Sequence, residues 1–198
     1  MLLTHHIILA VLWILFGVLH SVLAADWFKR IMLSRLGRHY KYYTFAYSII
    51  ATLSLAGTLA YQFSIPQQWL WVMPVWGQIL MLLPLLTGLY IMGAMIKKYF
   101  FALSGISVFY KKQAPVELEL GGWNHYVRHP LYFGTLLFVW SLCFIFPTLG
   151  NVIACSIITA YTLAGTVLEE RKLVMQFGKA YADYQQRVPM IIPMFRKK

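Results

Sequence analysis

Five long apolar runs, separated by short polar stretches, constrain the possible folds of this chain most strongly. They occupy residues 4–25, 42–62, 72–96, 131–146 and 151–168. Each run is long enough to cross a hydrocarbon core of roughly 30 Å. A segment in lipid must satisfy its backbone hydrogen bonds internally, which favours helices. We therefore predict an all-α polytopic membrane protein with five transmembrane helices plus interfacial helices, forming a single integral membrane domain over residues 1–198.

The composition points to the same class. Of 198 residues, 60% are hydrophobic and 12% are charged, whereas a soluble domain carries about 25% charge. The net charge of +11 is gathered between the apolar runs, so membrane topology and anionic lipid headgroups explain it better than nucleic acid does. Cys143 and Cys155 both lie within apolar runs and predict small buried hydrophobes rather than a disulfide.

The connections between the apolar runs alternate in charge. Lysines and arginines lie at 29–41, at 97–128 and after residue 168, whereas 62–71 and 147–151 carry no charge. The positive-inside rule then places the N-terminus outside and the C-terminus inside. No Lys or Arg precedes the first run and further spans follow, so we interpret it as a retained helix rather than a signal peptide.

Local signals divide the chain further. Residues 1–96 form a three-helix part, in which Pro84 should kink the third helix. Residues 97–120 form an interfacial connection, in which an aromatic-rich stretch at 97–112 is bracketed by lysine pairs. Residues 121–198 form a helical hairpin and a tail. In that tail, residues 169–187 show an amphipathic helical stripe that Gly178 divides.

One constellation of charged residues carries potential chemistry. The last two spans are joined by a tight turn at 147–151, so they form a hairpin. Arg128 and His129, before its first arm, should return to the membrane level of Glu169 and Glu170, after its second arm. The plainer alternative is a set of interfacial charges that anchor the hairpin through weak salt bridges.

The residues around this constellation favour a binding site. Pro130 starts the span and leaves Arg128 and His129 in a non-helical approach segment. Gly134, about one helical turn later, permits close approach of a ligand or of another backbone. The glycine pair at 121–122 and Asn124 make the preceding loop irregular, and binding residues often lie in such loops.

At this point the chain resembles a known family. The stretch WNHYVRHPLYFG at 123–134 is similar to the RHPxYxG signature of the isoprenylcysteine carboxyl methyltransferase and phospholipid methyltransferase superfamily. The later residues resemble its C-terminal pattern: Glu169, Glu170, Leu173, Phe177, Gly178, Tyr181, Tyr184, Arg187, Val188, Pro189 and Pro193. The match covers roughly residues 120–193. The residues LHS at 19–21 and the basic connection after them resemble the bacterial NnrU-like and methanethiol S-methyltransferase-like branch.

The resemblance implies an S-adenosylmethionine-dependent methyltransferase, releasing S-adenosylhomocysteine, in a bacterial inner membrane with its active site facing the cytoplasm. The acceptor would be a lipophilic or small amphipathic carboxylate, thiol or amine. The implied catalytic residues are Arg128, Glu169 and His129, and no metal is implied. The implied cofactor-binding residues are His125, Val127, Arg128, His129, Pro130, Tyr132, Gly134, Glu169, Glu170, Tyr181 and Tyr184.

Two roles remain open for the charged residues. The Arg128 and His129 pair can bind the carboxylate of the donor, and either glutamate can accept from its ammonium or ribose hydroxyls. The three tyrosines offer aromatic faces to adenine or to the sulfonium cation. Alternatively, Arg128 and Glu169 hold the acceptor. Alignment of donor and acceptor carries much of the rate of a methyl transfer, and His129 or a glutamate is the candidate base for an acceptor that must lose a proton.

Two other function classes compete with the methyltransferase. One is a non-catalytic NnrU-like membrane protein that supports nitrogen-oxide metabolism or membrane assembly. The other is a membrane reductase that uses a nicotinamide cofactor. His20 lies inside the first apolar run, where it is either functional or hydrogen-bonded to a neighbouring helix. His5 and His6, near the outer boundary, are expected to be solvated at the interface.

Overall fold

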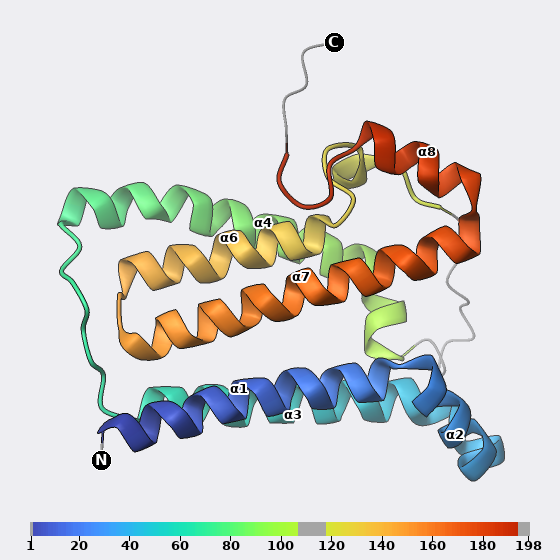
Figure 1. Ribbon diagram of the computed structural model, residues 1–198, viewed down its shortest axis with the longest axis horizontal. Coiled ribbons are helices and arrows are strands. Elements are labelled where there is room, and N and C mark those ends of the chain that lie inside the picture. Colours follow the sequence, from blue (N-terminus) through green and yellow to red (C-terminus); the bar gives the residue numbers. More distant parts are fainter. Residues whose placement is uncertain (1, 107–117, 194–198) are drawn as a thin grey trace. The chain divides into compact units, whose positions relative to one another are not determined.

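The computed structural model describes residues 2–106 and 118–193, which are helical apart from short loops and one isolated bridge (Figure 1). The predicted all-α class is confirmed for these residues. The helices are α1 (Leu2–Ala24), α2 (Asp26–Leu36), the 3-10 helix η1 (Gly37–Tyr42), α3 (Tyr43–Ser64), α4 (Val75–Ser104), the 3-10 helix η2 (Gly122–His125), α6 (Pro130–Ile145), α7 (Leu149–Phe177) and α8 (Lys179–Arg187).

Four stretches of the described residues are long and apolar enough to cross a membrane. They are Leu2–Ala24, Asp26–Ser64, Val75–Phe100 and Leu149–Phe177. The helix α6 is apolar but shorter, with 16 residues, so that its length is about 24 Å. By length and composition, the chain is therefore a polytopic membrane protein.

Several predicted boundaries were wrong. The third apolar helix does not end at residue 96, because α4 continues to Ser104 and stops at Gly105, whose φ is +69°. The basic connection after α1 is not a loop but folds into α2 and η1. Residues 107–112 of the predicted interfacial helix lie outside the described residues.

The last long helix also differs from its predicted bounds. Instead of ending at residue 168, α7 continues to Phe177 and carries both Glu169 and Glu170. Residues 169–177 contain no glycine or proline that would stop a helix. The predicted division at Gly178 is confirmed, because this residue has a φ of +54° and separates α7 from α8.

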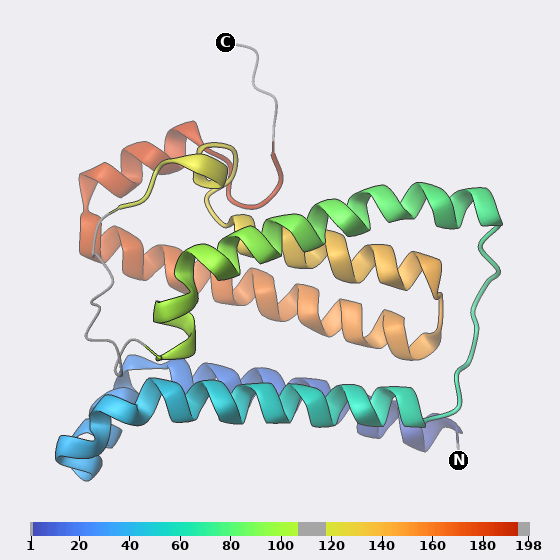
Figure 2. The same ribbon diagram turned by 180° about the vertical axis from the view of Figure 1, so that it is seen from behind.

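The described residues divide into two compact units. The first unit contains residues 2–70, 99–106 and 148–157. In it, α1 and α3 run side by side (Figures 1 and 2). A buried polar chain joins its helices: Trp13 Nε1 donates to Gln62 Oε1 at 2.9 Å, and Gln62 Nε2 donates to Asn151 Oδ1 at 2.7 Å.

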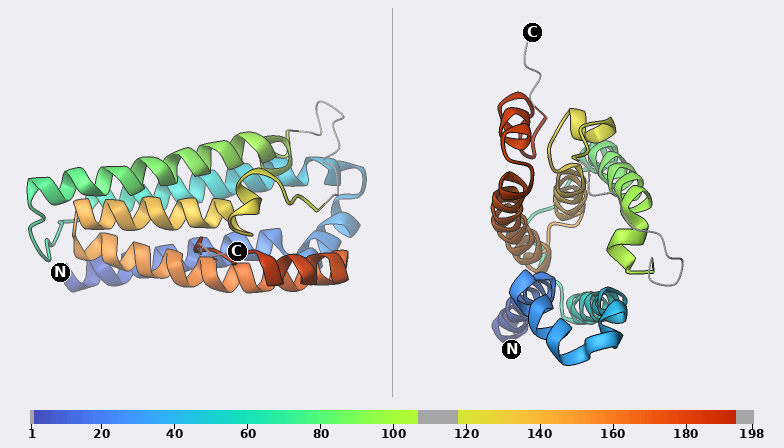
Figure 3. Two further views of the ribbon diagram at one scale, coloured as in Figure 1. Left: turned by 90° about the horizontal axis from the view of Figure 1, so that it is seen from above. Right: turned by 90° about the vertical axis from the view of Figure 1, so that its right-hand side faces the viewer.

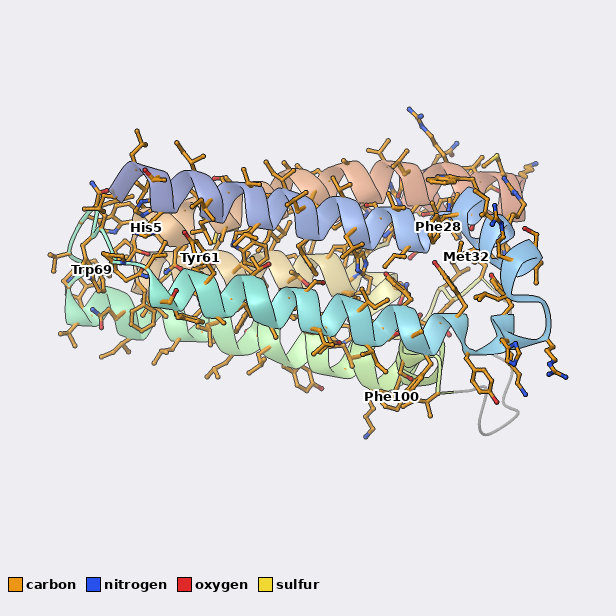
Figure 4. All side chains as sticks on the ribbon, turned by 90° about the horizontal axis from the view of Figure 1, so that it is seen from below. His5, Phe28, Met32, Tyr61, Trp69 and Phe100 are labelled. Atoms are coloured by element: carbon orange, nitrogen blue, oxygen red, sulfur yellow. The ribbon has the colours of Figure 1, made fainter. Side chains whose placement is uncertain are left out.

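Histidines of the first unit take part in helix packing. His5 Nδ1 lies 3.3 Å from the hydroxyl oxygen of Tyr61, and Figure 4 shows these two side chains near the same end. The hydroxyl oxygen of Tyr47 lies 2.9 Å from His20 Nε2, so His20 hydrogen-bonds a neighbouring helix. The predicted interfacial solvation was wrong for His6, whose side chain is buried with Nδ1 2.8 Å from the carbonyl oxygen of Leu2.

The second unit contains residues 71–98, 118–147 and 158–193. Within it, α6 and α7 form the predicted hairpin, and Trp140 Nε1 of α6 donates to Thr159 Oγ1 of α7 at 3.0 Å (Figure 1). The helices α4 and α6 touch through their backbones. A Cβ added to Gly88 would lie 2.6 Å from the carbonyl oxygen of Gly134. Only glycine permits this close crossing.

Candidate functional site

The approach segment before α6 is hydrogen-bonded to the segment that follows α8. Pro130 occupies the first turn of α6. The residues before it lie outside the helix, so their backbone N–H groups can bond to another segment. The Arg128 N–H donates to the carbonyl oxygen of Pro189 at 2.9 Å, and the His129 N–H donates to that of Met190 at 3.1 Å. The segment after α8 is therefore paired with the approach segment.

Arg128 connects this segment to α7 and α8. Its Nε donates to Glu170 Oε1 at 2.5 Å, and its Nη1 donates to the carbonyl oxygens of Gln185, at 3.0 Å, and of Val188. These contacts confirm the expectation that the hairpin brings Arg128 to Glu170. Only 9% of the Arg128 side chain is exposed.

Glu170 is surrounded by donors. Besides Arg128, its Oε1 lies 3.2 Å from His129 Nε2 and accepts from the Tyr181 hydroxyl at 3.3 Å. Its Oε2 accepts from Gln185 Nε2 at 2.9 Å, and only 12% of the side chain is exposed. Burial, reinforced by the Glu170 carboxylate, raises the pKa of Tyr181 well above its ordinary value, so its hydroxyl stays a donor. The Glu170 cluster comprises these five residues.

Glu169, the neighbouring residue, has a different environment. Its side chain is 46% exposed, although it lies on the same helix, α7, as Glu170. Its Oε2 accepts from the Tyr132 hydroxyl at 2.9 Å and lies 3.7 Å from His129 Nδ1. The rings of His129 and Tyr132 stack with centroids 5.6 Å apart. Glu169, Tyr132 and the Nδ1 edge of His129 thus form an accessible acidic corner, the Glu169 corner.

The remaining predicted residues surround these two clusters. The Tyr184 hydroxyl donates to the carbonyl oxygen of Asn124 at 2.5 Å, which ties the loop around η2 to α8 (Figure 3). Val127 and Pro130 are buried, whereas His125 is exposed on η2. Gly134 is not part of either cluster. Its α-carbon faces Gly88 of α4, so it serves the close crossing of the two helices.

Sequence reasoning did not name Gln185, and it used Asn124 only as a sign of an irregular loop. Gln185 binds Glu170 through its side chain and Arg128 through its carbonyl; its signal was the helical spacing that places it on the face of Tyr181. Asn124 Oδ1 is buried and has no hydrogen-bond partner among the described residues. Such an acceptor suits an N–H or O–H donor from a ligand. Within the same residues, no His, Cys, Asp and Glu side chains group as a metal site.

Three relatives share part of this sequence. The chain is 36% identical to a methanethiol S-methyltransferase of Crocosphaera subtropica over 88 residues, or 44% of this chain and 34% of that one. It is 39% identical to methanethiol S-methyltransferase 1 of Bradyrhizobium diazoefficiens over 71 residues, covering 36% and 24% of the two chains. It is 41% identical to the enzyme of that name from Pseudomonas deceptionensis over 71 residues, covering 36% and 26%.

These similarities cover only 24% to 34% of the length of those relatives. No solved structure matches the chain. The family described as NnrU protein, in contrast, matches residues 8–195, which include most of both units and every predicted site residue. The chain therefore belongs to the NnrU family.

Proposed function

We propose that this chain is an integral membrane methyltransferase that takes its methyl group from S-adenosylmethionine. The observation that carries the proposal is the Glu169 corner, an accessible carboxylate placed beside two stacked rings and next to a rigid ionic cluster. The names of the relatives, each called a methanethiol S-methyltransferase, support it. The resemblance of residues 120–193 to membrane methyltransferases supports it as well.

The polar groups of the site fit such a donor. S-adenosylmethionine presents an ammonium group and ribose hydroxyls, which all donate hydrogen bonds. Glu169 and the unpartnered Asn124 Oδ1 are suitable acceptors for them. The faces of His129 and Tyr132 suit a sulfonium cation or an adenine ring. Arg128 already donates to three protein acceptors. We therefore assign it to positioning, in contrast to the two roles that the sequence left open, binding the donor carboxylate or holding the acceptor.

When bound, S-adenosylmethionine supplies an electrophilic methyl group, whose carbon bonds to the acceptor while its bond to sulfur breaks and the electron pair stays on that sulfur. The protein must align the two reactants. The backbone pairing of His129 with Met190 and the contacts of Arg128 with α8 fix the walls of the site before any ligand binds. A pre-positioned site of this kind lowers the cost of alignment.

A thiol acceptor must also lose its proton, because the thiolate is the nucleophile. His129 is nearly buried between the two carboxylates, with 5% of its side chain exposed. Glu169 is the accessible group, so we assign it the thiol proton or the hydrogen bond that orients the thiol. His129 then orients Glu169 and stacks on Tyr132.

The membrane arrangement is part of the proposal. We infer that α6 is the fifth span and that the C-terminal ends of α1, α4 and α7 face the cytoplasm, as the positive-inside rule predicts. The basic α2 and η1 connection, with Lys29, Arg30, Arg35, Arg38 and Lys41, then meets anionic lipid headgroups at the inner surface of a bacterial inner membrane.

A second function is favoured by one observation, the saturation of Glu170 and Arg128 by protein groups. A cluster of this kind suits a structural clamp in a non-catalytic NnrU-like membrane protein supporting nitrogen-oxide metabolism or membrane assembly. Such a protein would have no use for the accessible Glu169 corner: it would not bind S-adenosylhomocysteine, and substitutions at the corner would leave its stability unchanged.

Calorimetric titration of S-adenosylhomocysteine into the detergent-purified protein tests the proposal. We expect binding to wild type, at least about tenfold weaker binding to Glu169→Gln, and wild-type binding to Glu119→Gln. Glu119 is the matched control, since its side chain is 45% exposed and pairs with Lys98 in the same unit. No binding to folded wild type, or equal binding by both variants, would overturn the proposed site.

A further inference from the structure

An apolar groove runs along α6 in the second unit. Its volume is about 450 Å³. Its walls include Phe133, Leu137, Trp140 and Phe144, which recur every three or four residues and so share one face of α6. The helix α4, which runs beside α6 in Figure 2, completes it. The hydroxyl of Ser141, also in the wall, donates to the Leu137 carbonyl within α6. The lining therefore suits hydrocarbon.

The residues at one end of the groove are sequence neighbours of residues in the candidate site. Ile191 and Ile192 form its wall there, immediately after Met190, whose carbonyl accepts from the His129 N–H. Phe133 follows Tyr132, whose hydroxyl donates to Glu169. From Phe133 the groove extends eleven residues along α6 to Phe144, a distance of roughly 16 Å. The groove therefore begins one residue along α6 from Tyr132 of the Glu169 corner and continues along this apolar helix.

We propose that this groove holds the hydrocarbon chain of the methyl acceptor, with the reacting thiol at the Glu169 corner. The inference rests on the proposed methyltransferase function and names its substrate class: a single-chain alkyl thiol rather than a one-carbon thiol. The volume lies at the lower end of ligand pockets, 300–1,000 Å³, and suits one chain. Methanethiol, for which the relatives are named, would leave this groove unused.

The alkyl chain of the acceptor takes no part in the bond changes. The thiol proton passes to Glu169 and then to water, and the sulfur electron pair forms the bond to the methyl carbon. The pair of the broken carbon–sulfur bond stays with the former sulfonium sulfur, which becomes a neutral thioether. The apolar contacts of the groove hold the alkyl chain and thereby orient the sulfur at the corner.

The first test is binding of bromodecanethiol, read by quenching of tryptophan fluorescence. Bromine quenches a neighbouring indole, so wild type should lose more emission than Trp140→Phe, in which the groove indole is absent. Trp76→Phe is the matched control, because Trp76 is 70% exposed in the same unit and does not line the groove. Quenching that is equal in wild type and Trp140→Phe would overturn the proposal.

The second test compares turnover of decanethiol and methanethiol. Leu136→Trp adds bulk to the groove wall, so we expect it to lower kcat/KM for decanethiol at least about tenfold and to change that for methanethiol less than about twofold. The same substitution at Leu86, which is exposed and outside the groove wall, should change neither. An equal loss for both thiols in Leu136→Trp would contradict the groove assignment.

S-adenosylhomocysteine binding to the same preparations separates the two possible failures. If it binds wild type but decanethiol is not preferred, and the quenching does not depend on Trp140, the groove assignment fails and the methyltransferase stands. If folded wild type binds no S-adenosylhomocysteine and methylates no thiol, the proposed function fails and the groove assignment fails with it.

Discussion

The two units solve the problem of polar groups among apolar helices in different ways. In the first unit, Trp13, Gln62 and Asn151 form a chain of neutral hydrogen bonds in which each bond joins two helices. In the second, Arg128 and Glu170 form an ionic pair with further donors around it. The neutral bonds hold helices together. The ionic cluster also positions His129, which lies beside the accessible carboxylate of Glu169.

The two units also differ in how accessible their polar groups remain. The polar side chains of the first unit are hydrogen-bonded between helices. In the second unit, Glu170 is likewise bonded to protein groups, but Glu169 remains 46% exposed. We therefore expect two adjacent carboxylates on one helix to have different roles: Glu170 stabilises the fold and Glu169 binds the ligand. Measurements of stability and of binding in substituted proteins separate these roles.

Arg128→Ala should have the largest effect. Glu170 would lose its ion-pair partner in a nearly buried place, and α8 would lose two bonds to its last carbonyls. We expect a loss of about 3 kcal/mol in the free energy of unfolding, measured in mixed micelles, together with the loss of S-adenosylhomocysteine binding. Arg187→Ala, at an exposed arginine of α8, is the control. Unchanged stability of Arg128→Ala would show that the cluster is not a clamp.

Gln62→Ala should have the next largest effect, and it tests the neutral chain. Trp13 loses an acceptor and Asn151 loses a donor in the first unit, which should cost about 2 kcal/mol in the free energy of unfolding. We expect the folded variant to bind S-adenosylhomocysteine as wild type does. Gln176→Ala, an exposed glutamine on α7, controls for the substitution itself. Weakened binding at unchanged stability would mean that the two units are not separate in function.

Tyr181→Phe should have a smaller, pH-dependent effect. It removes one bond to Glu170, about 1 kcal/mol near neutral pH. Because the pKa of Tyr181 is raised in the folded protein, its contribution is full below the ordinary value of 10.0 and falls as the pH rises above it. The difference in Tm between wild type and variant should therefore shrink from about pH 8 to about pH 11. A difference that grows with pH would contradict the assignment, and Tyr126→Phe, at an exposed tyrosine, is the control.

Glu169→Gln should have the smallest effect on stability and a large one on binding. Its carboxylate is accessible, so we expect the free energy of unfolding to change by less than about 0.5 kcal/mol. The lost charge should weaken S-adenosylhomocysteine binding at least about tenfold. If Glu169→Gln instead destabilised the protein and bound S-adenosylhomocysteine normally, Glu169 would be the stabilising glutamate rather than the binding one.

Much of the site was predictable because the hairpin geometry follows from span length. Arg128 precedes one arm and Glu170 follows the other, so a tight turn between the arms brings them together. The direction of each carboxylate was not predictable. Adjacent helical residues point about 100° apart, and which of Glu169 and Glu170 faces Arg128 depends on the rotation of α7 against α6. Sequence spacing alone does not fix that rotation.

The sequence by itself determined that this chain is helical, apolar enough for membranes, and divided at Gly178, because hydrophobicity, backbone requirements in lipid and the φ of glycine are local properties. Only the tertiary structure decided that Gly134 serves a helix crossing at Gly88, that Gln185 completes the Glu170 cluster, and that His6 is buried. Each of these depends on a partner distant in the sequence, and contacts of this kind are set by packing rather than by the pattern of any one segment.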